Sequence, residues 1–259
     1  MLIVVSPAKS LDFESKLPTR KHSDSLMLDR SAELVTVMSQ KSPDELASMM
    51  SISPELAELN FERFQDWEPP FTPKNARPAV LAFNGDTYLG LDAYNSFSER
   101  DFTHSQKTLR ILSGLYGVLR PLDLIQPYRL EMGSKVSTDR GDTLYDFWGD
   151  EISDRLNTDL ADSPGASVLL NCASNEYFSS VNTKRIDGRV ITPRFLDAKD
   201  GGPYKMIGFF AKRARGAMAA WIIQNRAKSA KSVLSFDGLG YRHSAEHSEP
   251  GSPAFIRDN

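Results

Sequence analysis

The segment GLYGVLRPLDLIQPYRLEMG, residues 114–133, places four charged side chains among leucines, tyrosines and prolines: Arg120, Asp123, Arg129 and Glu131. Burying these charges without partners would cost on the order of several kcal/mol each. Two interpretations are open. The charges close two structural ion pairs, or the two arginines face a cleft that binds an anion while Asp123 and Glu131 fix their orientation.

Three predicted strands run directly into short loops rich in small and polar residues, at 6–9, 84–88 and 173–177. Ligand sites form at the carboxyl edge of parallel strands, so we expect these loops to converge. Such loops are polar in most α/β proteins, and a structural role is the alternative. With the charges of segment 114–133, the candidate residues are Lys9, Asp86, Tyr88, Tyr116, Arg120, Asp123, Arg129, Glu131, Ser174, Glu176 and Tyr177.

A third signal is electrostatic. The stretch 205–231 carries seven cations and no acid, although the whole chain has a net charge of -3. Such a local excess is typical of a surface that binds phosphates, and a solvated helix face is the alternative. The cations are Lys205, Lys212, Arg213, Arg215, Arg226, Lys228 and Lys231.

Residues 42–66 predict a pair of short helices. Ser42-Pro43-Asp44-Glu45 is a capping box, and Ser53-Pro54-Glu55 begins a second helix after a short turn. The pair resembles a helix-hairpin-helix, whose turn offers backbone N–H groups to a DNA phosphate. In this chain Ser51 and Ser53 replace the usual glycines, and acidic residues dominate both helices. A plain αα-hairpin without a ligand is the alternative.

Several common sites are missing from the sequence. It has no phosphate-binding P-loop, no dinucleotide fingerprint and no G-x-S-x-G elbow. The single cysteine, Cys172, forms no internal disulfide, and His243 and His247 alone have a metal-like spacing, in a polar stretch. We therefore expect neither a metal site nor a cofactor.

Short apolar runs alternate with helical patterns, and this alternation predicts an α/β fold with a central mixed β-sheet and helices packed around it. The predicted strands are 2–5, 79–83, 167–171, 189–196 and 205–211, with a further short strand at 109–114. The predicted helices are 24–39, 43–50, 54–64, 98–109, 145–161 and 213–228.

The composition, 40% hydrophobic and 25% charged, is typical of an ordinary globular protein. We predict a single domain over 1–259, with the helical hairpin 42–66 inserted in it and a polar tail at 243–259. The N-terminus reads as a strand and not as a signal peptide, and no apolar run is long enough to span a membrane. We expect a cytoplasmic protein.

Taken together, several segments resemble the successive signature blocks of the peroxide stress protein YaaA family, also called DUF328 or UPF0246. They occur in order from residue 1 to about residue 230, so the resemblance covers nearly the whole chain. The blocks are SPAKSLD (6–12), FNGDTYLGL (83–91), LSGLYGVLRPLDLIQPYRLEMG (112–133), LYDFWGD (144–150), ASNEYF (173–178) and FFAKRARG (209–216).

The resemblance implies a bacterial cytoplasmic protein of the oxidative-stress response that helps to limit the free iron that converts peroxide into hydroxyl radical. It also implies binding of double-stranded DNA, a basic cleft, a helix-hairpin-helix and an α/β fold peculiar to the family. No established reaction comes with it. Mapped onto this chain, the DNA-binding residues are Arg120, Arg129, Lys212, Arg213 and Arg215, with Ser51 and Ser53 of the hairpin as auxiliary contacts.

Two functional hypotheses follow. In the first, the protein binds double-stranded DNA with weak sequence preference through its cations. In the second, it is an enzyme that acts on a nucleotide or a nucleic-acid base at the strand-end cleft. The enzyme's candidate residues are Lys9, Arg120 and Arg129 for phosphate, Asp86 or Glu176 as general base, and Tyr88 or Tyr177 to stack on a base.

Overall fold

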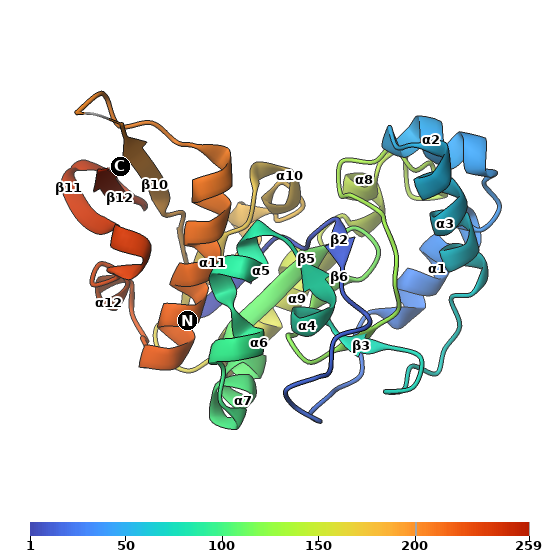
Figure 1. Cartoon of the computed structure of the whole chain (residues 1–259), viewed down its shortest axis with the longest axis horizontal. Coiled ribbons are helices and arrows are strands. Elements are labelled where there is room, and N and C mark those ends of the chain that lie inside the picture. Colours follow the sequence, from blue (N-terminus) through green and yellow to red (C-terminus); the bar gives the residue numbers. More distant parts are fainter. Residues whose placement is uncertain (200, 259) are drawn as a thin grey trace.

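The computed structural model describes residues 1–199 and 201–258 and has a five-stranded sheet at its centre (Figure 1). The strand order is β6-β5-β1-β8-β9, in which only β6 runs antiparallel. Every residue of β1, β5 and β8 is buried, as expected for parallel strands covered on both faces. The bounds are β1 Leu2–Val5, β5 Leu109–Ser113, β6 Gly117–Leu119, β8 Val168–Cys172 and β9 Arg189–Ile191.

Helices surround this sheet, so the predicted mixed α/β class is confirmed (Figure 1). The α-helices are α1 Leu28–Met38, α2 Pro43–Met50, α3 Pro54–Gln65, α4 Ala79–Ala82, α5 Asp86–Leu91, α6 Ala93–Ser96, α7 Glu99–Thr108, α8 Leu144–Trp148, α9 Glu151–Asp162, α10 Asn175–Phe178, α11 Gly208–Asn225 and α12 Ala230–Val233. Two 3-10 turns cover Thr183–Arg185 and Gly238–Gly240. No helix among the described residues is long and apolar enough to cross a membrane.

Three small sheets complete the fold. The largest has the order β10-β12-β11 and lies at the opposite end of the molecule from α1, α2 and α3 (Figure 1). Its strands are β10 Arg194–Ala198, β11 Arg242–Glu249 and β12 Ser252–Asp258. The two-stranded pairs are β2 Ser10–Leu11 with β4 Phe83–Asn84, and β3 Arg77–Pro78 with β7 Leu124–Ile125.

Several predicted elements are correct and others are wrong. Strands 2–5, 109–114 and 167–171 form as β1, β5 and β8. Residues 79–82 form a buried helix, and residues 205–211 contain the start of α11, so both strand predictions are wrong. A short apolar run cannot distinguish a buried strand from a buried helix, which explains both errors.

Two other predicted elements break at residues that end regular structure. The expected strand 189–196 divides at Pro193 into β9 and β10, which belong to different sheets. The expected helix 145–161 divides into α8 and α9 at Gly149, whose φ is +47°. The segment expected to be a polar tail forms β11 and β12, and Phe255 in β12 is fully buried.

The helical hairpin at 42–66 forms as α2 and α3. Ser42 and Glu45 form the predicted capping box, and the Ser53 hydroxyl accepts a hydrogen bond from the Leu56 N–H. Ser51 ends α2 with φ +51°, a left-handed conformation that favours glycine. The pair therefore exists as an αα-hairpin, while its identity as a helix-hairpin-helix remains a prediction.

Helices α5 and α11 pack against each other through two glycines. A Cβ on Gly216 would lie 1.8 Å from the carbonyl oxygen of Thr87 in α5. On the other side of the contact, a Cβ on Gly90 would lie 1.9 Å from the carbonyl oxygen of Arg213 in α11. Both distances are far below van der Waals contact, so only glycine allows the two backbones to approach this closely.

We predict that Gly216→Ala destabilises the protein by about 3 kcal/mol or more, because the added methyl group meets backbone that cannot move aside. For a chain of this size the melting temperature should fall by roughly 6 to 12 °C. Gly208→Ala, in the same helix, is the matched control, since a Cβ there has no atom within 4 Å. Equal melting temperatures for the two variants, measured by circular dichroism, would contradict the proposed role of this contact.

Candidate functional site

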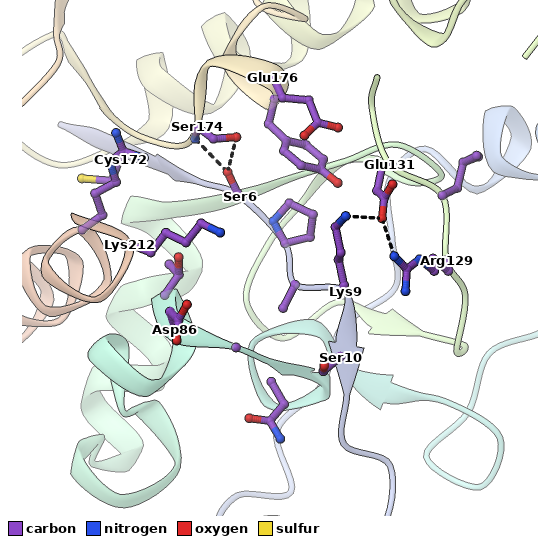
Figure 2. Close-up of a pocket in the computed structure, with 18 of the residues that line it drawn as sticks. Ser6, Lys9, Ser10, Asp86, Arg129, Glu131, Cys172, Ser174, Glu176 and Lys212 are labelled. Atoms are coloured by element: carbon purple, nitrogen blue, oxygen red, sulfur yellow. Dashed lines mark hydrogen bonds and ion pairs between the residues drawn. The ribbon is translucent and has the colours of Figure 1, made fainter. Parts of the chain in front are cut away.

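A pocket of about 300 Å³ lies beyond the carboxyl ends of β1 and β8 (Figure 2). The loops after β1 and β8, the start of α5, segment 128–131 and one face of α11 form its walls. The parallel strands β1 and β8 bring two of the predicted loops to one edge of the sheet. The third, at 84–88, does not follow a strand of this sheet and reaches the pocket at the start of α5, which packs on α11. Its lining residues are Ser6, Pro7, Ala8, Lys9, Ser10, Asn84, Gly85, Asp86, Thr87, Tyr128, Arg129, Leu130, Glu131, Cys172, Ser174, Glu176, Tyr177, Lys212 and Arg215.

Hydrogen bonds join the loops that form the floor of the pocket. The Ser174 N–H donates to the Ser6 hydroxyl oxygen at 2.8 Å, and the Tyr88 hydroxyl donates to the Ser6 carbonyl at 3.1 Å. Tyr88 is buried and does not line this pocket. Its place is behind the first loop, which it holds in position, and not in contact with a ligand.

One carboxylate holds two cations at the pocket wall. Glu131 Oε1 lies 3.0 Å from Lys9 Nζ and 3.0 Å from Arg129 Nη2 (Figure 2). Glu131 and Arg129 are largely buried, whereas Lys9 is exposed. The cluster contains one carboxylate and two cations, so its net charge is positive at the pocket wall.

Arg215 is the most unusual charge in the site. It is half-buried on α11, and its Nε is inaccessible to solvent and has no hydrogen-bond acceptor. Within residues 1–199 and 201–258, no carboxylate forms an ion pair with its guanidinium. Burial lowers the pKa of Arg215, because a desolvated cation without a counterion is unfavourable. A bound anion would supply the missing partner.

Lys212 lines the same pocket three residues earlier on α11 and points into it (Figure 2). Residues three apart on a helix share a face, so α11 presents Lys212 and Arg215 together. Arg213 lies between them in the sequence, is exposed and does not line the pocket. Of the three cations predicted on this helix, the fold brings two to the site.

Two carboxylates beside these cations come from different helices. Glu176 in α10 accepts a hydrogen bond from the Gly133 N–H at 3.0 Å, which fixes its position. Asp86 is the first residue of α5, and its carboxylate forms no ion pair or hydrogen bond with another described residue. Tyr177, also from α10, is buried in the wall, and desolvation raises its pKa. The pocket therefore combines cations, carboxylates and the aromatic rings of Tyr128 and Tyr177.

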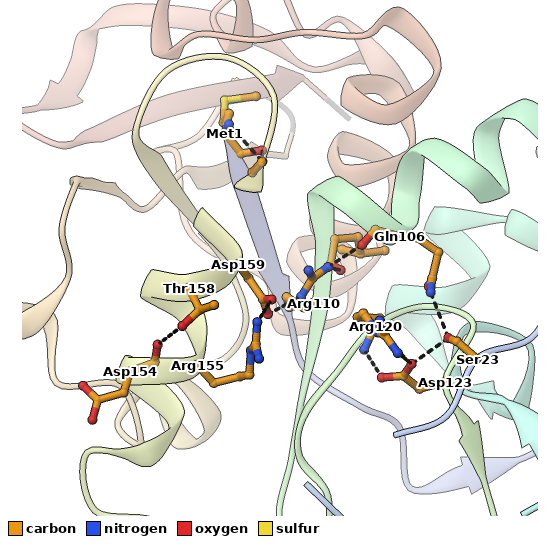
Figure 3. A network of polar contacts seen from close by, with 12 residues as sticks. Met1, Ser23, Gln106, Arg110, Arg120, Asp123, Asp154, Arg155, Thr158 and Asp159 are labelled. Atoms are coloured by element: carbon orange, nitrogen blue, oxygen red, sulfur yellow. Dashed lines mark hydrogen bonds and ion pairs between the residues drawn. The ribbon is translucent and has the colours of Figure 1, made fainter. Parts of the chain in front are cut away.

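The second arginine of segment 114–133 lies elsewhere. Arg120 pairs with Asp123 at 2.8 Å, and the Asp123 carboxylate also accepts a hydrogen bond from the Ser23 hydroxyl at 2.7 Å (Figure 3). Asp123 is completely buried, and desolvation raises its pKa despite the arginine beside it. Neither residue lines the pocket. The Arg120 pair fastens the chain near Ser23 to β7, so the two arginines of the segment have different surroundings.

Tyr116, Ser51 and Ser53 also lie outside the pocket. The Tyr116 hydroxyl is buried and accepts a hydrogen bond from Trp67 Nε1 at 3.0 Å. Ser51 and Ser53 are exposed at the ends of α2 and α3. The role of Ser51 and Ser53 as auxiliary DNA contacts therefore stays a prediction, separate from this pocket.

The histidine pair at 243 and 247 lies in β11, where each ring is close to a serine hydroxyl. His247 Nδ1 is 2.9 Å from Ser244 Oγ, and His243 Nε2 is 3.3 Å from Ser248 Oγ. Over the described part of the chain, no three His, Cys, Asp or Glu side chains are grouped so that they could hold a metal ion.

Residue-by-residue reading of the sequence missed one pocket residue of chemical interest, Cys172. The signal available was its position directly after the predicted strand 167–171 and two residues before Ser174, and in the structure it is the last residue of β8. Burial raises the pKa of the Cys172 thiol to about 12, although nearby Arg215 acts in the opposite direction. The thiol is therefore protonated near neutral pH, and the thiolate is the form that peroxide oxidises.

We predict that Cys172 reacts at least about 100-fold more slowly with a thiol-specific reagent in the native protein than in the urea-unfolded protein at pH 7. Hydrogen peroxide at matched concentration should leave the native thiol intact. Mass spectrometry of the alkylated and the peroxide-treated protein measures both results. Rapid native modification at pH 7 would mean that the thiol is accessible or ionised, contrary to this geometry.

Comparison with known proteins confirms the family resemblance. The family model described as "Peroxide stress protein YaaA" matches residues 1–247. A "UPF0246 protein" of Saccharophagus degradans is 52% identical over 257 residues, which cover 99% of each chain. Proteins of the same description are 50% identical in Hahella chejuensis, over 100% of each chain, and 52% identical in Colwellia psychrerythraea, over 99% of each chain. This chain therefore belongs to the peroxide stress protein YaaA family.

Proposed function

We propose that this member of a peroxide stress family binds double-stranded DNA and holds one phosphate-bearing nucleotide unit in the pocket. The observation that carries the proposal is Arg215, a half-buried guanidinium in the pocket wall without a counterion among the described residues. A phosphate offers oxygen atoms that accept hydrogen bonds, and the Arg215 Nε has no such acceptor in the structure. Arginine binds phosphate through two parallel hydrogen bonds.

The other charges of the pocket fit the same ligand. Four cations and three carboxylates line it, and Glu131 is occupied by Lys9 and Arg129. The phosphate would lie between Lys212 and Arg215, where no carboxylate is paired with either cation in the described chain. Tyr177 would supply an aromatic surface beside the base.

The size of the pocket limits what part of DNA can enter. A volume of about 300 Å³ is at the small end of ligand sites and accommodates one nucleotide unit, not a duplex. A nucleotide of a duplex would therefore enter after leaving the base stack, or from a strand end or a gap. Contacts to phosphates outside the pocket carry no base information, so we expect weak sequence preference.

Under this proposal the protein can limit iron-dependent damage without binding iron itself. The pocket has more cationic than carboxylate side chains, and positive charge disfavours binding of Fe²⁺. We propose that the protein limits damage by hydroxyl radical because it covers DNA, or through an indirect effect on free iron. The cytoplasm, where the DNA of a bacterial cell lies, is the location that this function needs.

A second candidate function is an enzyme that acts on the bound nucleotide. The specific observation is that Asp86 and Glu176 line the same pocket, whereas separation on opposite faces would have excluded a shared reaction centre. Asp86 is the better general base of the two, because the Gly133 N–H already binds Glu176. The proposed DNA binding does not depend on such a reaction.

We predict that Arg215→Ala weakens binding to a fluorescent DNA duplex by about 10-fold or more and reduces the slope of log K against log salt by about 1. Fluorescence anisotropy over a salt titration measures both quantities. The matched control is Arg213→Ala, which removes the same charge from an exposed position of the same helix outside the pocket.

The control variant should bind within about 3-fold of wild type, since an exposed phosphate contact contributes modestly. Equal losses in the two variants would reject the pocket as the site and leave only a general charge effect. Thermal melting of both proteins verifies that each is folded. Competition by a nucleoside monophosphate, expected against wild type and not against Arg215→Ala, tests the nucleotide unit directly.

A further inference from the structure

Three large apolar side chains are exposed together where α11 begins. Met206 and Phe209 are each 51% exposed and Ile207 is 41% exposed. We call Met206, Ile207 and Phe209 the apolar tip. Isolated exposed apolar residues are ordinary, and three within four positions are the densest group of them along the described chain.

The apolar tip precedes the pocket-facing part of α11 by about one helical turn and does not itself line the pocket. Phe209 is three residues before Lys212 on α11, so the two side chains share one face of the helix, and Lys212 points into the pocket (Figure 2). Behind the tip, the Phe210 ring packs edge-on against Phe209 at 5.6 Å and lies 4.7 Å from the Arg257 guanidinium carbon. The tip is therefore anchored to the small sheet through β12.

The charges around the apolar tip select the kind of partner. Lys205, Lys212 and Arg213 flank it, and the sequence has no acidic residue between Gly201 and Phe236. An apolar tip inside a cationic surface complements a partner with negative charge outside and apolar surface inside. Duplex DNA has both, as phosphates on its backbone and as stacked base faces between them.

We propose that the apolar tip inserts between base pairs of duplex DNA beside the nucleotide that the pocket holds. This inference rests on the proposed function, because the pocket receives the displaced nucleotide and the tip takes the place it leaves in the stack. Unstacking a base step is unfavourable, and apolar side chains that enter the step offset this cost. Single-stranded DNA needs no such insertion, so the apolar tip should contribute to duplex binding alone.

The experiment compares the double variant Met206→Ser/Phe209→Ser with wild type and with Leu26→Ser, a control that removes one large side chain, 48% exposed, outside the pocket. The probes are a duplex that carries one 2-aminopurine, whose fluorescence rises on unstacking, and the corresponding single strand. Wild type should raise the duplex fluorescence. The double variant should lose this rise and at least 5-fold in duplex affinity, and keep single-strand affinity within 2-fold.

The outcomes separate this inference from the function on which it rests. If wild type binds neither duplex nor single strand, both proposals fail. If wild type binds DNA and Arg215→Ala weakens both forms, while the double variant matches wild type and Leu26→Ser, the pocket stands and the tip proposal alone is overturned. A double variant that changes only self-association or binding to anionic vesicles overturns it as well, and assigns the tip to those partners.

Discussion

The close contact between α5 and α11 is the constraint on which the candidate site depends. Gly90 and Gly216 remove the two side chains that would separate these helices, so the backbones approach to a distance that no other residue allows. Asp86 begins α5, and Lys212 and Arg215 lie on α11, so the same approach brings a carboxylate and two cations to one pocket. A wider spacing would place them on separate surfaces.

The central sheet supplies the other half of the site. Strands β1 and β8 are parallel neighbours, so the loops that follow them leave the sheet at the same edge. The hydrogen bond from the Ser174 N–H to Ser6 joins these loops directly. Lys9, Glu176 and Tyr177 therefore reach one pocket although more than 160 residues separate the first from the others.

Charge pairing distinguishes structural arginines from functional candidates in this molecule. Arg120 has a buried carboxylate partner, Asp123, and connects segments of the fold. Arg129 shares Glu131 with Lys9, and Arg215 has no counterion in the described chain. The protein thus leaves positive charge unbalanced at the pocket, which is the property expected of an anion site. Cys172 contributes a buried, protonated thiol to this wall, so its chemistry is not that of a peroxide-sensing thiolate.

The sequence by itself determined the fold class, the strands β1, β5 and β8 and the helical hairpin, because these features depend on local periodicity and helix caps. It could not tell Arg120 from Arg129, since both lie among apolar residues with an acid two or three positions away. It also could not show that residues 79–82 and 208–211 are helical, because short apolar runs suit either structure. Tertiary structure alone decided these points, because what distinguishes the two ion pairs, Ser23 beside Asp123 and Lys9 beside Glu131, and what packs around a short apolar run come from residues distant in the sequence.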